Sequence, residues 1–392
     1  MDITVKRLLK PPTRSFFLFG PRCVGKSTWM RDNLKDAFHI DLLNGSLCIE
    51  LTQDPHKLQS LIGDRLSGSW IVLDEIQKVP ALLDEVHRLI EEKRWNFALC
   101  GSSARKLRRF GTNLLGGRAI TRVLEPFSYQ EVKDTFELDF AIEWGMLQIV
   151  YTDKENALDI LNSYVHTYVK EEIKEEGIVR SLPPFLRFLS VCGQINGQII
   201  NSQNIAREAS VPRSSVDVYF SIMTDTYLGN FLPSYRPNVK VREQVHPKFY
   251  WFDPGTARAA AGLLNDKTDS IWKGFALETI IYHELRVYNH INNRNRDIFY
   301  YRTSSGVEID FIIETCKKQM STPAHVVCIE IKSSKKWDRQ WEKPMRQLAD
   351  ASTIIVDKMV GVYTGENYYK YDNVDVMPVR NFLEALHKGL IF

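Results

Sequence analysis

The stretch FFLFGPRCVGKSTWM, residues 16–30, decides the fold of the N-terminal part of this chain. Its first four residues are apolar and lead to Gly20, which predicts a buried strand that enters a turn. Residues 20–27 then read GPRCVGKS and match the phosphate-loop pattern GxxxxGK followed by Ser or Thr, and residues 28–34 continue with a helical pattern. Strand, glycine-rich loop and helix follow in the order that the motif requires. We therefore interpret the stretch as a phosphate-binding loop rather than as a chance match in a glycine turn.

The residue types of this loop suit a bound triphosphate. Glycines let the backbone curl so that successive amide hydrogens converge on phosphate oxygens, and the helix that follows adds its positive N-terminal end. We expect Lys26 to reach the β and γ phosphates and Ser27 to ligate magnesium, so ATP and Mg²⁺ are the expected cofactors. The predicted cradle consists of Gly20, Pro21, Arg22, Cys23, Val24, Gly25, Lys26, Ser27 and Thr28.

A second apolar strand, residues 70–75, ends on two adjacent acids, Asp74 and Glu75. Phosphoryl transfer depends on positioning and charge stabilisation more than on covalent chemistry. We expect Asp74 to support the magnesium shell and Glu75 to polarise the attacking water. Downstream of a phosphate loop, these roles are favoured over an ordinary strand that ends in a solvated acidic turn.

A third strand, residues 96–100, runs into Gly101, Ser102 and Ser103. A polar side chain at this point is placed to sense the γ phosphate. Ser102 is equally suited to cap the helix that is predicted to start near Ala104. Both interpretations stay open, and both serines are included in the predicted nucleotide site.

A further strand over residues 38–42 gives an alternation of strands and helices, which predicts a parallel α/β sheet. Four segments of the chain resemble the bacterial and archaeal AAA+-type P-loop ATPases that carry a family-specific C-terminal domain of uncharacterised function. These segments are GPRCVGKST, WIVLDEIQKVPALLDEVHRLIE, FALCGSSARKL and GGRAITRVLEPFSYQE. The resemblance covers the whole chain, with one modest departure at Cys23, where the family commonly has Gln or Arg.

The resemblance implies that an arginine from a neighbouring subunit completes the ATPase site, because its guanidinium neutralises charge that develops during transfer. Arg118, in the GGR turn, is the first candidate and Arg105 the second. The alternative is that both are solvated surface arginines. Since an arginine supplied in trans makes hydrolysis depend on a neighbour, we expect a closed homo-oligomeric ring, which the family resemblance makes a hexamer.

The 392 residues are enough for two or three domains. The α/β alternation stops near Tyr129, and the segment that follows has a helical pattern as far as about Arg187. The predicted regions are a P-loop AAA+ core at 1–130, a helical lid or linker at 131–200, a winged-helix-like region at 201–262 and a nuclease-like domain at 263–392.

Charge and cysteine usage restrict the class of protein. The net charge of +3 gives no global argument for nucleic acid, although two local clusters are basic. Six cysteines without any CxxC pair fit a reducing cytosol and no zinc site. The sequence has neither a signal-peptide pattern nor an apolar run of about eighteen residues, so we expect a cytoplasmic protein without a membrane partner. The basic clusters are Arg105, Lys106, Arg108 and Arg109, and Lys332, Lys335, Lys336, Arg339 and Lys343.

The middle of the chain has the outline of a helix-turn-helix. Residues 202–209 and a stretch from about Ser214 read as helices around a tight turn at 210–212, and a β wing is expected near residues 248–253. Arg213 and Ser214 would lie at the leading end of the second helix, which enters the major groove in nucleic-acid binders. That helix is poor in Arg and Lys, which slightly favours packing or a lid between domains over DNA binding.

The C-terminal third holds a second set of chemically active residue types. The segment SSGVEIDFII, residues 304–313, predicts a turn and a strand with Asp310, and VVCIEIKSS, residues 326–334, predicts a strand with Glu330 and Lys332 on one face. An amphipathic helix upstream, marked by apolar residues from Leu277 to Tyr288, bears Glu278. This D…ExK pattern resembles the restriction-endonuclease-like core.

That resemblance implies a metal-dependent site. Asp310 and Glu330 would hold a magnesium ion against the scissile phosphate, Glu278 would be the supporting acid, and Lys332 would orient or deprotonate the water. The alternative is that Glu330 and Lys332 pair across a solvated sheet face. Catalysis and this structural role stay equally open.

Taken together, the sequence predicts an α/β fold: a P-loop AAA+-like parallel sheet, a helical and winged-helix region, and a restriction-endonuclease-like α/β domain. The predicted protein is an ATPase that couples hydrolysis to binding or processing of nucleic acid, with DNA the first candidate. One alternative is a nucleotide-dependent switch or scaffold with a catalytically inactive C-terminal domain. Another is a DNA-translocating motor without cleavage.

Overall fold

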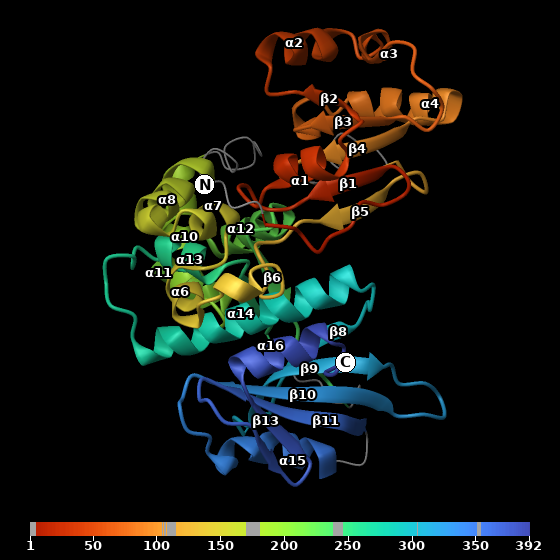
Figure 1. Ribbon diagram of the computed structural model, residues 1–392. Coiled ribbons are helices and arrows are strands. Elements are labelled where there is room, and N and C mark those ends of the chain that lie inside the picture. The colour runs from red at the N-terminus through yellow and green to blue at the C-terminus, as the bar shows by residue number, and fades with distance from the viewer. Residues whose placement is uncertain are drawn as a thin grey trace. The chain divides into compact units, whose positions relative to one another are not determined.

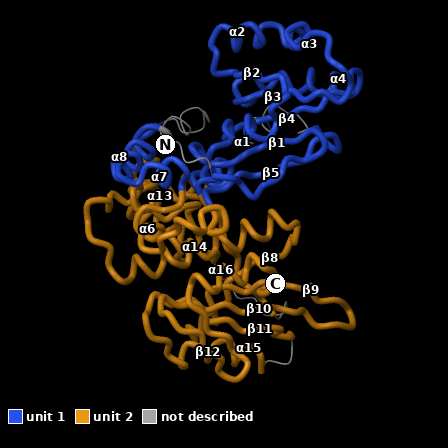
Figure 2. The backbone as a smooth tube through the Cα atoms, viewed as in Figure 1, with its two compact units in different colours: residues 1–127, 147–182, 218–228 blue, residues 128–146, 183–217, 229–392 orange. Residues whose placement is uncertain are grey.

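The computed structural model describes residues 5–103, 105, 107, 115–169, 181–237, 246–303, 305–350 and 354–392. The chain folds into two compact units, and each unit is made from several stretches of sequence (Figure 2). Unit 1 comprises residues 1–127, 147–182 and 218–228, and unit 2 comprises residues 128–146, 183–217 and 229–392. The four regions expected from the sequence stay a prediction, since the compact units cut across them.

Unit 1 is built on a five-stranded sheet with the order β2-β3-β4-β1-β5, in which all neighbouring strands are parallel. The strands are β1 (Phe16–Phe19), β2 (Phe38–Asp41), β3 (Trp70–Asp74), β4 (Asn96–Cys100) and β5 (Ile120–Val123). β1 lies between β4 and β5, and all four of its side chains are fully buried. An apolar strand in the middle of a parallel sheet is covered on both faces, which explains the continuous run FFLF.

Helices connect these strands and cover the sheet (Figure 1). The helix α4 shows why: Leu82, Val86 and Leu89 recur at helical spacing and are buried in the core of the unit, while the acidic and basic residues of α4 mostly face outward. The longer helices of the unit are α1 (Lys26–Asn33), α2 (Gly45–Gln53), α3 (Lys57–Ile62), α4 (Leu82–Lys93), α7 (Gln148–Thr152) and α8 (Ala157–Ser163). Because the carboxyl ends of parallel strands lie at one edge of the sheet, the loops after β1, β3 and β4 are brought together.

The predicted helices of the middle region are confirmed. α11 (Ser202–Glu208) and α12 (Arg213–Asp225) flank a turn in which Ser210 has a left-handed backbone, with φ of 52°. Two antiparallel strands follow, β6 (Gly229–Leu232) and β7 (Lys248–Trp251). The other helices of this part of the chain are α6 (Leu138–Trp144), α10 (Leu182–Gln194) and α13 (Pro254–Ala260).

A six-stranded mixed sheet with the order β12-β13-β11-β10-β9-β8 forms the C-terminal part of unit 2. β8, β9 and β10 pair antiparallel, and β10 pairs parallel with β11. The strands are β8 (Asp297–Arg302), β9 (Glu308–Cys316), β10 (Ala324–Lys332), β11 (Ile354–Tyr363), β12 (Tyr369–Tyr371) and β13 (Val374–Pro378). The α/β fold class expected from the sequence is therefore confirmed for both sheets.

Three helices flank this sheet. α14 (Ser270–Ile291) and α16 (Val379–His387) lie on one face, and α15 (Lys343–Asp350) lies on the other (Figure 1). Along the chain the order is α14, three antiparallel strands, α15 and a parallel strand, so the helix with Glu278 precedes the strands with Asp310 and Glu330. Within the described residues, no helix is long and apolar enough to cross a membrane.

Candidate active sites

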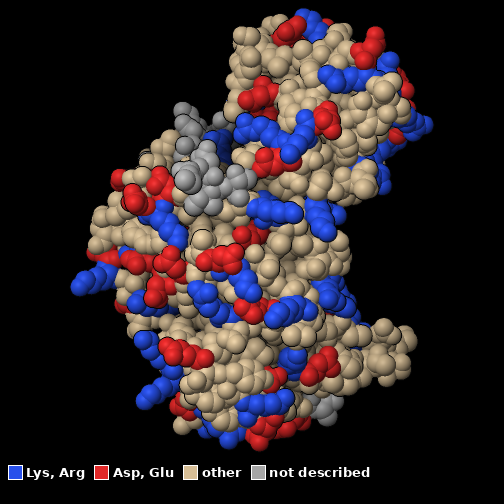
Figure 3. Space-filling view, viewed as in Figure 1, with Lys and Arg blue, Asp and Glu red and all other residues tan. Residues whose placement is uncertain are grey.

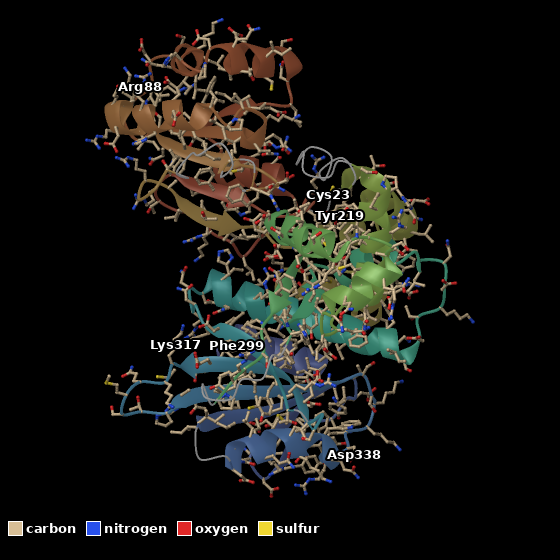
Figure 4. The ribbon with its side chains drawn as sticks, turned by 180° about the vertical axis from the view of Figure 1, so that it is seen from behind. Cys23, Arg88, Tyr219, Phe299, Lys317 and Asp338 are labelled. Atoms are coloured by element: carbon tan, nitrogen blue, oxygen red, sulfur yellow. The ribbon has the colours of Figure 1, made fainter. Side chains whose placement is uncertain are left out.

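The phosphate loop of unit 1 runs from the end of β1 to the start of α1 in a left-handed backbone path. Cys23, labelled in Figure 4, has φ of 62°, and Gly25 has φ of 85°. A Cβ atom at Gly25 would lie 1.9 Å from Oε1 of Gln148 on α7, so any larger residue would require this side chain to move, and the left-handed backbone itself favours glycine. Gln148 thus lies directly against the loop. The sequence motif does not predict this contact, because the two residues are far apart in the chain.

Lys26 closes the loop on itself. Its side chain is 8% exposed, and Nζ donates hydrogen bonds to the carbonyl oxygens of Gly20, at 2.8 Å, and Pro21, at 2.7 Å. Ser27 and Thr28 follow on the first turn of α1 and are exposed. An ammonium that already binds two oxygens at the mouth of the loop is placed to exchange them for phosphate oxygens, which form stronger charge-assisted bonds.

The two predicted acids lie where β3 ends. Asp74 accepts a hydrogen bond from the backbone N–H of Glu75, at 3.0 Å, and Glu75 itself has a left-handed backbone with φ of 59°. β4 separates β3 from β1 in the sheet, and all three strands are parallel. The acids and the phosphate loop therefore belong to the same edge of the sheet, as the sequence pattern predicts.

Gln77 connects Glu75 to Ser102, and the sequence analysis did not single it out. Its amide nitrogen donates to Oε2 of Glu75 and to Oγ of Ser102, the latter at 3.3 Å. Gln77 is only 4% exposed, and its Oε1 has no hydrogen-bond partner among the described residues. A Cβ atom at Gly101 would lie 2.5 Å from Oε1 of Gln77, so this glycine makes the approach possible. The one available signal is the position of Gln77, two residues after the acid pair.

The two serines after β4 have different partners. Ser102 faces Gln77, whereas Oγ of Ser103 accepts the backbone N–H of Arg105 at 3.1 Å. The capping type of contact, considered for Ser102, is therefore made by Ser103. Ser102 is buried beside the acid pair, and its role as a γ-phosphate sensor stays a prediction.

Both candidate arginines have acidic partners within unit 1. Nε of Arg118 lies 2.5 Å from Oε1 of Glu91, and the Arg118 side chain is 38% exposed. Nη1 of Arg105 lies 2.8 Å from Oδ2 of Asp225 and donates to Ser221, and its side chain is 19% exposed. Arg118 is the more accessible of the two, and a role in trans stays a prediction for both. Lys106, Arg108 and Arg109 of the basic cluster lie outside the described residues.

In unit 2, the fold brings the three residues of the D…ExK pattern together. The register of β9 and β10 pairs Phe311 with Ile329, which sets Asp310 opposite Glu330. Nζ of Lys332 contacts Oε1 of Glu330 and lies 3.9 Å from Oδ2 of Asp310. Asp310 and Glu330 are both buried, so the Glu330–Lys332 pair exists but does not lie on the solvated face that the alternative interpretation required.

Glu278 approaches this group from α14 but has partners of its own. Its Oε2 accepts a hydrogen bond from the hydroxyl of Tyr250 at 2.8 Å and lies 3.6 Å from Nζ of Lys248. Burial raises the pKa of Glu278 to about 7, although the positive charge of Lys248 opposes this shift. Burial, followed by the charge of Asp310, also raises the pKa of Glu330 well above its usual value.

Lys248 and Tyr250, both on β7, belong to the same group of side chains and were missed by the sequence analysis. The side chain of Lys248 is 5% exposed, and its Nζ lies 2.6 Å from Oε1 of Glu308. Burial disfavours the charged form of Lys248, but the carboxylates of Glu278, Asp310 and Glu308 outweigh it and raise its pKa. The one sequence signal for Lys248 is that a lysine directly precedes three aromatic residues in the stretch KFYW. In the structure all four residues of this strand are buried. We call Lys248, Glu278, Glu308, Asp310, Glu330 and Lys332 the carboxylate cluster.

The donor set of this cluster fits a magnesium ion that a substrate helps to bind. Oε2 of Glu330 is buried and has no hydrogen-bond partner among the described residues. Such an oxygen is available to bind a cation. The part of the chain that the structure describes contains no group of three or more His, Cys, Asp or Glu side chains able to hold a metal ion alone. Mg²⁺ is commonly held by one or two carboxylates plus phosphate oxygens, and Asp310 with Glu330 satisfies that requirement.

Surface charge gives limited guidance on partners. On the face drawn in Figure 3, basic and acidic side chains are mixed over both units. Of the second basic cluster, Lys335, Lys336 and Lys343 are exposed, and they follow closely on Lys332 in the chain. Arg339 is engaged by Asp372, with 2.8 Å between Nη2 and Oδ2. In the helix-turn-helix segment, Arg213 is exposed and is the single basic residue of α12.

Comparison with known proteins assigns the N-terminal region. Residues 12–133 match the AAA domain family, residues 136–267 match a domain of unknown function (DUF8612), and residues 273–382 match another domain of unknown function (DUF4143). No curated protein matches the chain. One similar solved structure is the Orc1 protein of Aeropyrum pernix in complex with DNA, with 13% identity over 64% of this chain and 87% of that chain. Its TM-score is 0.27, so the assignment of the N-terminal region rests on the AAA match.

Proposed function

We propose that this chain, whose residues 12–133 form an AAA domain of the P-loop ATPase class, binds and hydrolyses ATP and couples hydrolysis to the binding or processing of nucleic acid, with DNA as the first candidate. The observation that carries the proposal is the edge of the unit 1 sheet where Lys26, the Asp74–Glu75 pair and Ser102 follow three adjacent parallel strands. These residue types are the ones that phosphoryl transfer needs, and they come from three separate segments of the sequence.

Each residue of the site has a defined part in the proposed reaction. Lys26 exchanges the carbonyls of Gly20 and Pro21 for β- and γ-phosphate oxygens, and Ser27 and Asp74 are the residues that would hold a magnesium ion. A bound ion would supply positive charge against the charge that develops on the phosphate. Glu75 orients the attacking water, and Gln77 fixes the carboxylate of Glu75. Arg118 of a neighbouring subunit is the proposed source of additional positive charge, in a homo-oligomeric ring that we propose to be a hexamer.

The carboxylate cluster is the proposed site of nucleic-acid processing. Asp310 and Glu330 provide two adjacent carboxylates on neighbouring strands, and the ammonium of Lys332 lies between them. Lys332 would orient the water that attacks the phosphodiester, and the unpartnered Oε2 of Glu330 would bind Mg²⁺. Exposed Lys335, Lys336 and Lys343 would contact the nucleic-acid backbone.

The proposal is tested by an ATPase assay on the purified full chain over a panel of single-stranded, duplex and branched DNA and RNA, with Mg²⁺ or Mn²⁺ present. The nucleic-acid strands are sized after each reaction. We expect magnesium-dependent hydrolysis that is stimulated by at least one DNA substrate and abolished by Lys26→Ala. Hydrolysis that is indifferent to every nucleic acid contradicts the coupling, and hydrolysis that survives Lys26→Ala contradicts the assigned site.

A second candidate is a nucleotide-dependent switch or scaffold whose C-terminal domain binds without cleaving. It is favoured by the internal pairing of the carboxylate cluster, since Lys332 is engaged by Glu330, and Oδ2 of Asp310 accepts the backbone N–H of Ile331 at 2.7 Å. Metal-dependent cleavage that disappears in Asp310→Ala and in Lys332→Ala supports the nuclease. Binding that persists in both variants, with no cleavage by the wild type, supports the switch.

A third candidate, a DNA-translocating motor without cleavage, predicts ATP-dependent strand displacement. Lys26→Ala is the control, because it removes the ammonium that would bind the triphosphate. Turnover that does not depend on DNA counts against the motor.

A further inference from the structure

Lys248 is a member of the carboxylate cluster that the D…ExK pattern does not contain. It lies on β7, within residues 136–267, whereas the carboxylates of the cluster lie within residues 273–382. Its ammonium is nearly sealed from solvent and lies 2.6 Å from Oε1 of Glu308 and 3.6 Å from Oε2 of Glu278. The ring of Tyr300 lies beneath it, with 5.5 Å from Nζ to the ring centroid. A separate region of the chain therefore inserts a positive charge into the cluster.

The charges of the cluster divide into two pairs of carboxylates. Lys248 faces Glu278 and Glu308, and Lys332 faces Asp310 and Glu330. Among the charged groups described around it, Arg302 is at the rim, 3.4 Å from Oε2 of Glu308 and 45% exposed. The cluster thus holds four carboxyl groups and two ammonium groups, so a further cation would balance those carboxyl groups that are ionised.

An ammonium held by carboxylate oxygens satisfies them as a bound cation would, because it supplies both the charge and the hydrogen bonds that burial demands. Nζ of Lys248 forms ion pairs with Oε2 of Glu278 and Oε1 of Glu308. Oε2 of Glu278 also accepts a hydrogen bond from the hydroxyl of Tyr250. Oε2 of Glu330, on the other side of the cluster, has no hydrogen-bond partner among the described residues. In a two-metal site, by contrast, ions about 4 Å apart would need carboxylates on both sides to be open.

We propose that the Lys248 ammonium is a built-in cation that takes the place of a second divalent ion, so that the cluster binds one divalent ion, at Asp310 and Glu330. This inference rests on the proposed metal-dependent role of Asp310 and Glu330. It explains why Glu278 is held by β7, and it makes Lys248 a positioning residue for the site. It also means that residues 273–382 alone do not contain the complete cluster.

Mn²⁺ binding tests the proposal without relying on activity. The full chain is used free of nucleotide and with Asp74→Asn, so that an ion at the phosphate loop is not counted. A short DNA duplex is present in every sample, because phosphate oxygens of the substrate help to bind the ion, and the Mn²⁺ bound by the duplex alone is subtracted. Calorimetry and the paramagnetic resonance of free Mn²⁺ give the number of ions and the affinity. Lys248→Met removes the charge but keeps the length of the side chain, and Lys248→Arg keeps the charge. Lys273→Met removes a charge from the exposed face of α14 and is the matched control.

We expect one ion in the Asp74→Asn chain, lost in Glu330→Gln. Lys248→Met should raise the affinity about tenfold or admit a second ion, because it leaves the carboxylates of Glu278 and Glu308 without the charge of Lys248. Lys248→Arg and Lys273→Met should bind as the Asp74→Asn chain does. Two ions bound by the Asp74→Asn chain would contradict the role of Lys248. Unchanged or weaker Mn²⁺ binding by Lys248→Met would contradict it as well. Neither result contradicts the metal site at Asp310 and Glu330.

The remaining outcomes separate the two proposals. If only Lys248→Met binds Mn²⁺, the built-in cation stands and the metal-dependent nuclease fails. If no variant binds, both fail, and if Glu330→Gln binds as well as its parent, the metal site is misassigned. Where Lys248→Met does not fold, Glu308→Gln decides. It leaves the charge of Lys248 less compensated and should weaken Mn²⁺ binding about threefold or more. Unchanged or tighter binding in that variant overturns the inference.

Discussion

Glu75 illustrates how a single residue is prepared for its proposed task. Its backbone is left-handed directly after β3, and the amide of the buried Gln77 donates a hydrogen bond to one carboxylate oxygen. A non-glycine residue in this conformation costs free energy, which the surrounding contacts must offset. The left-handed backbone and the hydrogen bond from Gln77 together restrict the orientation of this carboxylate, as the proposed role of Glu75 requires.

Replacing Gln77 by Leu should therefore impair turnover more than binding. Without the amide, the carboxylate of Glu75 is free to rotate, and we expect kcat for ATP hydrolysis to fall about tenfold while ATP affinity changes less than about twofold. Glu75→Gln should lower kcat about 100-fold or more, again with binding retained. Steady-state kinetics and calorimetry measure both quantities, and Gln53→Leu on exposed α2 is the matched control. A rise in KM at constant kcat would contradict a positioning role for Gln77.

Glu278 predicts a pH dependence of stability. Its pKa is raised to about 7, whereas an ordinary glutamate titrates near 4.5. The native state therefore holds the proton more tightly, so the stabilisation from protonated Glu278 is present below about pH 4.5 and is lost as the pH rises to about 7. Glu278→Gln cannot ionise, so it does not lose this stabilisation as the pH rises. The free energy of unfolding of the variant minus that of the wild type should therefore increase between about pH 4.5 and pH 7, by about 3 kcal/mol at most.

Denaturant unfolding between pH 5 and pH 8 in the presence of a chelator measures this difference. Glu208→Gln, at an exposed carboxylate of α11, should show a difference that does not change with pH. A constant difference for Glu278→Gln as well would mean that this carboxyl titrates normally in the folded chain.

At the residue scale, the sequence predicts what depends on local spacing. Lys26, Asp74 and Glu75 follow from a loop motif and a strand end, and Asp310, Glu330 and Lys332 from two strand patterns. Other residues of the two sites escape this reasoning because their roles arise from contacts between distant segments. They are Gln77, Gln148, Lys248 and Tyr250.

Among the elements, the strands are predicted best. β1 and β4 have the predicted bounds, because short apolar runs bounded by glycine or polar residues mark buried strands clearly. The first helix starts at Lys26, two residues before the predicted start, because the left-handed Gly25 directly precedes it. α14 is 22 residues long, but the apolar pattern picked out residues 277–288, since burial on several sides removes a simple amphipathic signal.

Two groups of basic residues lead to different predictions for DNA binding: Lys335, Lys336 and Lys343, which lie between the end of β10 and the first residue of α15, and Arg213 at the start of α12. Changing Lys335, Lys336 and Lys343 together to Ala should weaken binding about tenfold and reduce the slope of log affinity against log salt by about 2 to 3, because each phosphate contact contributes about 0.9. Arg213→Ala should weaken binding less than about threefold, since α12 offers only one basic residue. Fluorescence anisotropy at several salt concentrations measures both effects. The reverse order of effects would assign DNA binding to α12 instead.

For the whole molecule, the compact units could not be predicted from the order of the sequence. Residues 147–182 and 218–228 join unit 1 although unit 2 segments precede and follow them. Composition and hydrophobic pattern change along the chain, but they do not show which later segments pack against the core of the N-terminal residues. The AAA core was predicted because its strands, loop and helices are close in sequence.

Assembly should govern catalysis if Arg118 acts in trans. Arg118→Ala should bind ATP normally and hydrolyse it about 1000-fold more slowly, because the neighbour no longer supplies a guanidinium. Mixing Arg118→Ala with Lys26→Ala should restore part of the activity, since mixed assemblies contain sites with both an intact loop and an intact arginine. Arg122→Ala, at a half-buried position on β5, is the control. Mixtures no more active than their components, in a sample shown by light scattering to be assembled, would place Arg118 outside the reaction.

The most direct test of the account is calorimetric titration of nucleotide-free protein with ATP and Mg²⁺. The account predicts saturable binding of one nucleotide per chain, weakened about tenfold or more by Lys26→Ala, because a charged hydrogen-bond donor to phosphate is worth about 1.5–3 kcal/mol. Absence of binding by folded wild-type protein, or equal binding by Lys26→Ala, would contradict the claim that the loop at residues 20–27 holds a triphosphate.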